Sequence, residues 1–285
     1  MRNFTFKGLL LAAMFMVLGS LAIQAADDDG LITKQIIVKL EKAGTLPDRI
    51  GSTKRNKITN LKIIGEINGT DLRVIRYMAG RDYYDSESDG KLAILDLSET
   101  KIVSGGGRYL YDDYYRDYFY THDNELGSRA FYNCSGLTSL SLPSGITSIG
   151  WEAFSGCSGL TSLSFPSGIT SIGGYAFSGC SGLTSIYVYA EKLPNMESDV
   201  FDGCDAKKCT VYVPKGTYDD YWLSEFGYFE NIVEFDPTGI NNVITSNDTK
   251  ELSRYSLNGQ RLSAPTKGLN IVKYSDGSVK KVAVQ

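Results

Sequence analysis

The chain has 285 residues, of which 42% are hydrophobic and 22% charged, and its formal net charge at pH 7 is −4. The length is sufficient for a sizeable core, and the weak negative charge argues against nucleic acid as the main partner. The one histidine, His122, lies in a polar stretch, and no glycine-rich phosphate loop or zinc-type spacing occurs. We therefore expect a non-catalytic protein without a cofactor or metal.

The N-terminus predicts a secretory signal peptide over residues 1–25. Basic residues precede an apolar run, Gly8–Leu21, and the small residues Ala22, Ala25 and Ala26 follow it. The run is shorter than 18 residues, and no other long apolar run occurs, so we expect no membrane span in the mature chain. The predicted location is therefore exported, either at the cell surface or secreted.

In chain order, residues 31–130 are expected to form an N-terminal cap followed by degenerate coils. A strand is predicted at Gln35–Leu40 and a short helix at Ala43–Ile50, which would shield the first coil. Apolar alternation predicts strands at Ile58–Gly65 and Leu92–Ser98. The segment Asp71–Met78 predicts a helix with Asp71 as its N-cap.

Residues 128–189 contain three near-copies of one sequence with a period of 23 residues: Ser128–Thr147, Trp151–Thr170 and Gly174–Tyr189. A period of this size with an L-x-x-L-x-L core is typical of leucine-rich repeats. The pattern predicts an α/β repeat solenoid, a right-handed stack whose short parallel sheet has about six strands. Pro143–Gly145 would turn the chain after the strand, and Gly156 would supply a positive φ.

Regular repeats and a C-terminal cap are predicted over residues 130–236. Thr210–Pro214 is expected to be the last strand, Lys215–Phe226 an amphipathic helix, and Asn231–Phe235 a closing strand. The large rings of this stretch suit a cap over an open apolar stack.

A polar linker over residues 237–250 and a small antiparallel β tail over residues 251–285 complete the predicted domains. The pairs Asn258-Gly259 and Asp276-Gly277 predict hairpin turns in the tail.

The five cysteines raise the question of disulfides in an exported chain. Cys134, Cys157 and Cys180 hold one repeat position, which predicts a ladder of buried free thiols. For Cys204 and Cys209 two interpretations stay open: a mutual disulfide, or continuation of the ladder by Cys204.

Two insertions interrupt the degenerate coils. The first, Arg81–Gly90, is acidic and partly matches a calcium loop at Asp85, Glu87 and Asp89, but a strand follows where a helix would be required. The second, Tyr109–Glu125, is rich in tyrosine. Its rings either pack on the flank of the coils or form a contact surface, because tyrosine offers large area at low entropic cost.

The candidate ligand contacts are the tyrosines of this second insertion and the outward positions of the repeat strands. A solubilising face without a ligand is the alternative for the strand positions. The candidates are Tyr109, Tyr111, Tyr114, Tyr115, Tyr118, Tyr120, Thr138, Ser139, Ser141, Thr161, Ser162, Ser164, Thr184, Ser185 and Tyr187.

The coil A-F-x-x-C-S-G-L-T-S-L-x-L-P-S-G-I-T-S-I-G resembles the BspA-like leucine-rich repeats of exported bacterial surface proteins. The resemblance covers Ala130–Tyr189 and extends to the closing segment Thr210–Phe235 and to three upstream stretches, Ala43–Leu46, Ile58–Leu61 and Leu95–Ser98. The tail from Tyr255 resembles the C-terminal sorting tails of type IX secretion. The resemblance carries over no catalytic motif and no fixed binding residue.

This resemblance implies adhesion to proteins or glycans on host or neighbouring cells. The net charge argues against a nucleic-acid partner, and the sequence does not predict the oligomeric state. We therefore expect an exported or cell-surface leucine-rich repeat binding protein. The alternatives are a structural surface spacer and a glycan-binding accessory protein without its own catalysis.

Overall fold

The computed structural model describes residues 30–236, 251–256, 261–262, 264, 268–274 and 279–284. The predicted signal peptide, the linker and both tail turns lie outside the described residues. The chain divides into two compact units, Met1–Pro237 and Thr238–Gln285, and each is described by itself. None of the helices within the described residues is long and apolar enough to cross a membrane.

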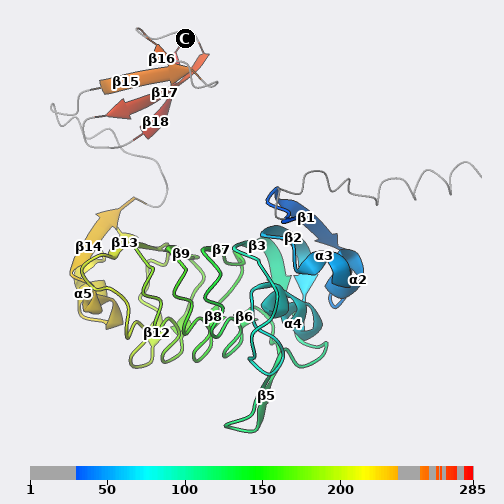
Figure 1. Cartoon of the computed structure of the whole chain (residues 1–285). Coiled ribbons are helices and arrows are strands. Elements are labelled where there is room, and N and C mark those ends of the chain that lie inside the picture. The colour runs from blue at the N-terminus through cyan, green and yellow to red at the C-terminus, as the bar shows by residue number, and fades with distance from the viewer. Residues whose placement is uncertain are drawn as a thin grey trace, which may run out of the picture. The chain divides into compact units, whose positions relative to one another are not determined.

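Parallel strands line one side of the first unit and follow one another along the stack (Figure 1). They form two hydrogen-bonded groups, which adjoin where the Thr161 amide donates to the Thr138 carbonyl at 3.2 Å. The first group is β1 (Ile36–Leu40), β2 (Asn60–Ile67), β3 (Ile94–Ile102) and β7 (Ser139–Ser141), and the second is β9 (Ser162–Phe165), β11 (Ser185–Val188), β13 (Thr210–Pro214) and β14 (Asn231–Phe235).

The described residues of this unit thus place eight strands along one side, where the sequence predicted about six. The two additional strands are β1 and β14, which were expected in the caps. Both pair in parallel with their neighbours, Ile37 with Lys62 and Tyr212 with Val233. The caps therefore continue the ladder as well as covering its ends.

Two further sides of each coil also bond to the next coil. A second parallel sheet comprises β6 (Glu125–Leu126), β8 (Ser148–Ile149), β10 (Ser171–Ile172) and β12 (Asn195–Met196). On the third side the amide of Phe131 donates to the carbonyl of Ala153 at 2.7 Å, and that of Phe154 to Ala176 at 2.7 Å. The turns of each coil belong to no helix or long strand. Hydrogen bonds to the neighbouring coils on three sides therefore satisfy their backbone polar groups.

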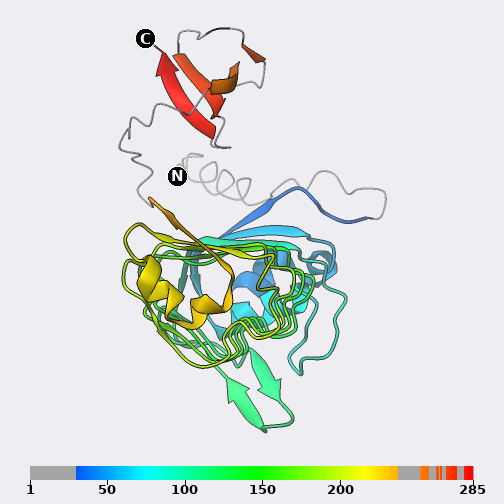
Figure 2. The same cartoon turned by 90° about the vertical axis from the view of Figure 1, so that its left-hand side faces the viewer.

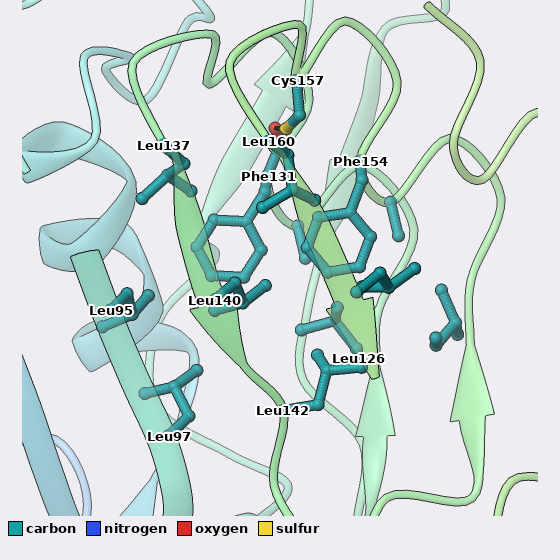
Figure 3. Close-up of a cluster of buried hydrophobic side chains, with 14 of the residues drawn as sticks. Leu95, Leu97, Leu126, Phe131, Leu137, Leu140, Leu142, Phe154, Cys157 and Leu160 are labelled. Atoms are coloured by element: carbon teal, nitrogen blue, oxygen red, sulfur yellow. Dashed lines mark hydrogen bonds between the residues drawn. The ribbon is translucent and has the colours of Figure 1, made fainter. Parts of the chain in front are cut away.

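The repeat places identical side chains above one another in the interior (Figure 3). The rings of Phe131, Phe154, Phe177 and Phe201 stack in sequence, with centroids 5.5, 5.1 and 5.8 Å apart. All four are at most 1% exposed. Because one coil cannot bury its own apolar face, each ring depends on its neighbours for burial.

The predicted cysteine ladder is confirmed, and it extends to Cys204. The thiols of Cys157, Cys180 and Cys204 each lie 3.1–3.3 Å from the phenylalanine carbonyl of the preceding coil, to which they donate. All five cysteines are free and buried. The disulfide interpretation of Cys204 and Cys209 is therefore wrong.

The predicted positive φ is found at Gly156, with a value of +77°, and Gly179 repeats it at +71°. The first coil carries Asn133 at this position, with φ of +59°. Asparagine is among the few other residues that tolerate this conformation, so the coil keeps its shape without glycine.

Three short helices cover the first coils: α2 (Leu46–Ile50), α3 (Ser52–Arg55) and α4 (Gly69–Met78). The N-cap of α4 is Asn68, so the prediction of Asp71 as N-cap is wrong. Asp71 is the third helical residue, and its buried carboxylate accepts from the amides of Gly44, Leu46 and Asn68 at 2.5–3.0 Å. This carboxylate therefore joins the segment before α2 to the start of α4.

The C-terminal cap contains two short helical pieces, α5 (Tyr218–Trp222) and η1 (Glu225–Tyr228), instead of the one helix predicted (Figure 2). Leu223 and Ser224 separate them, and Ser224 caps η1 by accepting from the amide of Phe226. The buried rings of Phe226 and Phe229 lie 5.2 and 5.0 Å from that of Phe201, so they end the phenylalanine stack.

The hairpin β4 (Leu110–Asp112) and β5 (Asp117–Phe119) interrupts the stack before its regular part and projects from it (Figure 1). The second unit is an antiparallel sheet, as predicted, with the strand order β16-β15-β17-β18. Its strands are β15 (Glu251–Ser256), β16 (Arg261–Leu262), β17 (Gly268–Tyr274) and β18 (Val279–Val284).

Candidate binding cleft

The base of the β4–β5 hairpin is fixed to the coils by Tyr109. Its ring is fully buried, and its hydroxyl donates to the Ser128 carbonyl at 2.6 Å. Burial raises the pKa of this hydroxyl. A buried ring cannot meet a ligand, so the prediction of Tyr109 as a contact residue is wrong; it anchors the hairpin instead.

Asp112 organises the tip of the hairpin. One of its carboxylate oxygens accepts from the backbone amides of Tyr114 and Tyr115, each at 2.8 Å. The other oxygen pairs with the guanidinium of Arg129. This local turn presents the two rings outward: the side chain of Tyr114 is 86% exposed and that of Tyr115 57%.

Arg129 connects the hairpin to the coils. Its guanidinium pairs with Asp112 and, at 2.6 Å, with Glu152 of the next coil. The same guanidinium carbon lies 4.8 Å from the ring centroid of Trp151 and 5.3 Å from that of Tyr115, distances typical of cation–π contacts. Because Arg129 is buried, these contacts hold the tip of the hairpin against two successive coils.

The loop over residues 81–90 forms a second wall. The two oxygens of Asp85 accept from Arg76 at 2.9 Å and from the Asn133 amide at 2.8 Å. The Asp85 oxygens thus serve side chains of the protein, and no group of three or more metal-ligating side chains occurs among the described residues. Tyr84 of this loop meets Tyr111 of the hairpin edge-on, at 6.1 Å between ring centroids.

Between these walls lies a cleft with a volume of about 490 Å³. Four carboxylates line it, whereas the only cationic group in its lining is the guanidinium of Arg129. The lining residues are Tyr84, Asp85, Leu110, Tyr111, Asp112, Asp113, Tyr114, Tyr115, Arg129, Tyr132, Asn133 and Glu152.

Besides the buried Tyr109, two of the predicted insertion tyrosines, Tyr118 and Tyr120, lie outside this lining. Arg108 lies 3.6 Å from the ring centroid of Tyr118 and donates to the hydroxyl of Tyr120 at 2.7 Å. That hydrogen bond raises the pKa of the Arg108 guanidinium. Tyr118 and Tyr120 are about two-fifths exposed, so they extend the aromatic surface of the hairpin beyond the cleft.

The nine predicted strand-face residues are also absent from the lining of the cleft. The threonines among them bond to the preceding coil: the hydroxyl of Thr161 donates to the Thr138 carbonyl at 3.1 Å, and that of Thr184 to the Thr161 carbonyl at 3.0 Å. Tyr187 stacks on Tyr212 with 4.5 Å between ring centroids. Much of this face therefore stabilises the stack itself.

The thiols are unsuited to nucleophilic chemistry. Burial raises the pKa of Cys134 to about 11, and those of Cys204 and Cys209 to about 12. Such thiols remain protonated near neutral pH. His122 is exposed and does not line the cleft.

Sequence reasoning missed the coil residues that build the cleft or its support, among them Arg129, Tyr132, Trp151 and Glu152. A signal for them was available in the repeats. The first two coils differ at five positions between Ser128 and Gly173, and four of these lie in the corner that precedes the repeat cysteine. The varying pairs are Ser128 and Trp151, Arg129 and Glu152, Tyr132 and Ser155, and Asn133 and Gly156.

The coils match the model of a known repeat family. Residues 120–221 match the model of the BspA type leucine-rich repeat region, in 6 copies. Repeats of this class typically serve protein–protein interaction, are typically surface-exposed and are typically not catalytic.

A crystal structure of a leucine-rich repeat protein from Bacteroides ovatus ATCC 8483 is similar, with 21% sequence identity and a TM-score of 0.38. The match covers 71% of this chain and 42% of that protein, so the chain spans less than half of its length. None of the curated proteins matches the chain.

Proposed function

We propose that the protein is an exported, non-catalytic adhesion protein whose main contact surface is the β4–β5 hairpin with its cleft. The observation that carries the proposal is the exposure of Tyr114 and Tyr115 on a hairpin that Arg129 and Tyr109 hold in place. Exposed tyrosines supply large contact area at low entropic cost, and a preformed support reduces the cost of ordering on binding.

The strand face is the proposed secondary surface. Its residues stand in register, as in the pairing of Ser185 with Ser162 and Thr210, and this gives a flat surface of repeated hydroxyls. The threonine hydroxyls already bond to carbonyls, so the serines such as Ser139, Ser141 and Ser164 are the groups that remain for a ligand. Small side chains of this kind contribute little energy each, which places the surface second.

Features at the two ends of the chain support the proposed export and surface location. The apolar run Gly8–Leu21 supports export, and the tail from Tyr255 supports sorting to the surface by its resemblance to type IX tails. Fractionation of cells expressing the chain with and without residues 255–285 tests this part. Equal distribution of both forms would remove the tail from the proposal.

The adhesion proposal is tested by capture of host matrix proteins and bacterial surface proteins on the immobilised full chain. We expect binding that the double variant Tyr114→Ser, Tyr115→Ser abolishes. The matched control is Tyr218→Ser, Trp222→Ser, because these residues form an exposed stacked ring pair at the C-terminal cap.

Each contrary outcome has a distinct meaning. Binding that survives the double variant would transfer the contact to the strand face. Absence of binding to every protein would favour a structural spacer. Turnover of a peptide or polysaccharide would overturn the non-catalytic assignment.

A further inference from the structure

We propose that the cleft beside the hairpin receives a cationic side chain, arginine or lysine, of a protein partner. This inference rests on the proposed function and names the chemistry that its contact surface recognises. It starts from the charges at the cleft: Asp85, Asp112, Asp113 and Glu152 line it with the single guanidinium of Arg129, and the buried Arg76, outside the lining, pairs with Asp85. Arg76 compensates Asp85, and Arg129 compensates one of the two charges of Asp112 and Glu152, so two of the four negative charges remain uncompensated.

The protein already holds one guanidinium in this manner. Arg129 lies 4.5 Å from the ring centroid of Tyr132 and 4.8 Å from that of Trp151, and carboxylates pair with it from two directions. Aromatic faces attract cations through the ring quadrupole, and carboxylates add charge-assisted hydrogen bonds. Rings combined with carboxylates therefore suit cations in this part of the molecule.

A second set of the same groups faces solvent. Tyr84 and Tyr114 are 60% and 86% exposed, and both line the cleft with Tyr111. Asp113, which also lines the cleft, is exposed, and no hydrogen bond or ion pair engages its side chain within residues 30–236. Three rings and an unpaired carboxylate thus remain for a cation that comes from outside.

The occupied carboxylates favour a cation over a neutral glycan. Asp112 and Glu152 share one arginine, so their combined charge is only half compensated by Arg129. A neutral sugar would stack on the rings, but it would leave the remaining carboxylate charge uncompensated. A guanidinium or an ammonium group would gain from both the rings and the local field.

The test is NMR titration of the full chain with a blocked pentapeptide, glycine–serine–arginine–serine–glycine, and with its lysine counterpart. Isosteric peptides carrying citrulline or acetyl-lysine remove only the charge. We expect the arginine and lysine peptides to shift the ring signals of Tyr84 and Tyr114. We expect the uncharged isosteres to bind about tenfold more weakly.

The variant Asp113→Asn keeps the shape of the exposed carboxylate and removes its charge. We expect it to weaken the arginine peptide severalfold and to leave the uncharged peptide unchanged. The control is Asp219→Asn, which removes an exposed carboxylate from the C-terminal cap and should change nothing.

Equal binding of charged and uncharged peptides would overturn the inference, as would ring shifts with neutral oligosaccharides but not with the cationic peptides. Either result leaves the adhesion proposal standing if capture of surface proteins still requires Tyr114 and Tyr115. Conversely, suppose that the capture experiment shows no binding although the peptide titration is positive. That result would overturn the adhesion proposal, while the cation preference of the cleft stands.

Discussion

The strand side and the outer corner of the coils differ in how far the repeats agree. From Leu137 to Ser141 the first coil has the same residues as the second from Leu160 to Ser164. The corner before the repeat cysteine, in contrast, carries four of the five differences between these coils. Both segments belong to the same coils and have the same number of residues in each, so coil geometry alone does not explain the contrast.

What each region contacts explains the difference. A strand residue lies against its own copy in the next coil, as Leu163 pairs with Ile186, so any change must fit its neighbours above and below. Corner residues of the first two coils face the hairpin instead: Arg129 pairs with Asp112, and Trp151 meets Tyr115 at 5.9 Å between ring centroids. Repeat positions that are identical between coils are therefore those that stack on the next coil. Positions that differ between coils contact a segment outside the repeats, here the hairpin.

The largest effect is expected from breaking the phenylalanine ladder. Phe154→Ala removes a fully buried ring that stacks on Phe131 and Phe177, and should lower the free energy of unfolding by about 3–5 kcal/mol. Urea denaturation measures the loss. The matched control is Ser178→Tyr, which copies Tyr132 into a half-buried corner position and should cost within about 0.5 kcal/mol. Equal costs would contradict the distinction between the two regions.

The next effect concerns the clamp between hairpin and coils. Arg129→Leu leaves the carboxylates of Asp112 and Glu152 without their shared cation, and should cost about 3 kcal/mol. Tyr175→Leu changes the same repeat position one coil beyond Glu152, where the side chain is 38% exposed. Both residues have positive φ, +56° and +55°, so the backbone penalty cancels in the comparison.

Thermal unfolding and hydrogen exchange of the Tyr114 and Tyr115 amides measure the effect of the clamp. We expect Arg129→Leu to lower the melting temperature and to accelerate exchange at the tip. Tyr175→Leu should change neither strongly. If exchange at the tip stays slow in Arg129→Leu, the hairpin is held by Tyr109 alone.

A smaller effect is expected from alkaline pH acting on the thiol ladder. Burial raises the pKa of Cys134 from 9.0 to about 11, so the thiol keeps its proton longer in the folded chain than in the unfolded chain. Its stabilising effect is complete below pH 9 and is lost as pH rises from 9 to 11. The loss at pH 10.5 is roughly 2 kcal/mol for this one thiol.

The variant Cys134→Ala isolates this contribution. It should lose less stability between pH 8 and pH 10.5 than the parent chain, although it is less stable at pH 8. Urea denaturation at both pH values gives the comparison. An identical loss in both chains would assign the alkaline effect to other groups, such as Tyr221, whose pKa burial raises to about 12.

The sequence was sufficient to predict the stack because each coil carries the same residue pattern as the coil on which it packs. The period of 23 residues, the buried leucines, the cysteine ladder and the positive φ of Gly156 all follow from one coil that must fit against its copy. The outermost strand of each four-stranded group was assigned to a cap, because β1 and β14 lack the repeat motif although each pairs in parallel with its neighbour.

The cleft could be predicted only in part. The tyrosines of the insertion were visible, but which rings are buried depends on contacts between distant segments, such as that of Tyr109 with Ser128. The corner residues could have been found by comparing the coils and asking where they differ. Their partner could not, because nothing in the local sequence of Arg129 indicates Asp112.

The smallest expected changes in stability distinguish an exposed tyrosine of the hairpin from an exposed threonine of the strand face. Tyr114→Ser removes an 86% exposed ring and should change the free energy of unfolding by less than about 0.5 kcal/mol, while weakening binding at the hairpin. Thr161→Val should do the opposite. Thr161 is exposed on the strand face, but its hydroxyl bonds to the preceding coil, so its loss should cost about 1 kcal/mol and leave binding unchanged.

Urea denaturation and capture assays on the same two variants give both quantities. If Thr161→Val weakens binding more than Tyr114→Ser does, exposure in the register of the repeats is itself functional, and the strand face becomes the main contact surface. If each variant affects only its own quantity, the coils act as the support and the irregular hairpin as the contact, because only the hairpin has side chains that no neighbouring coil requires.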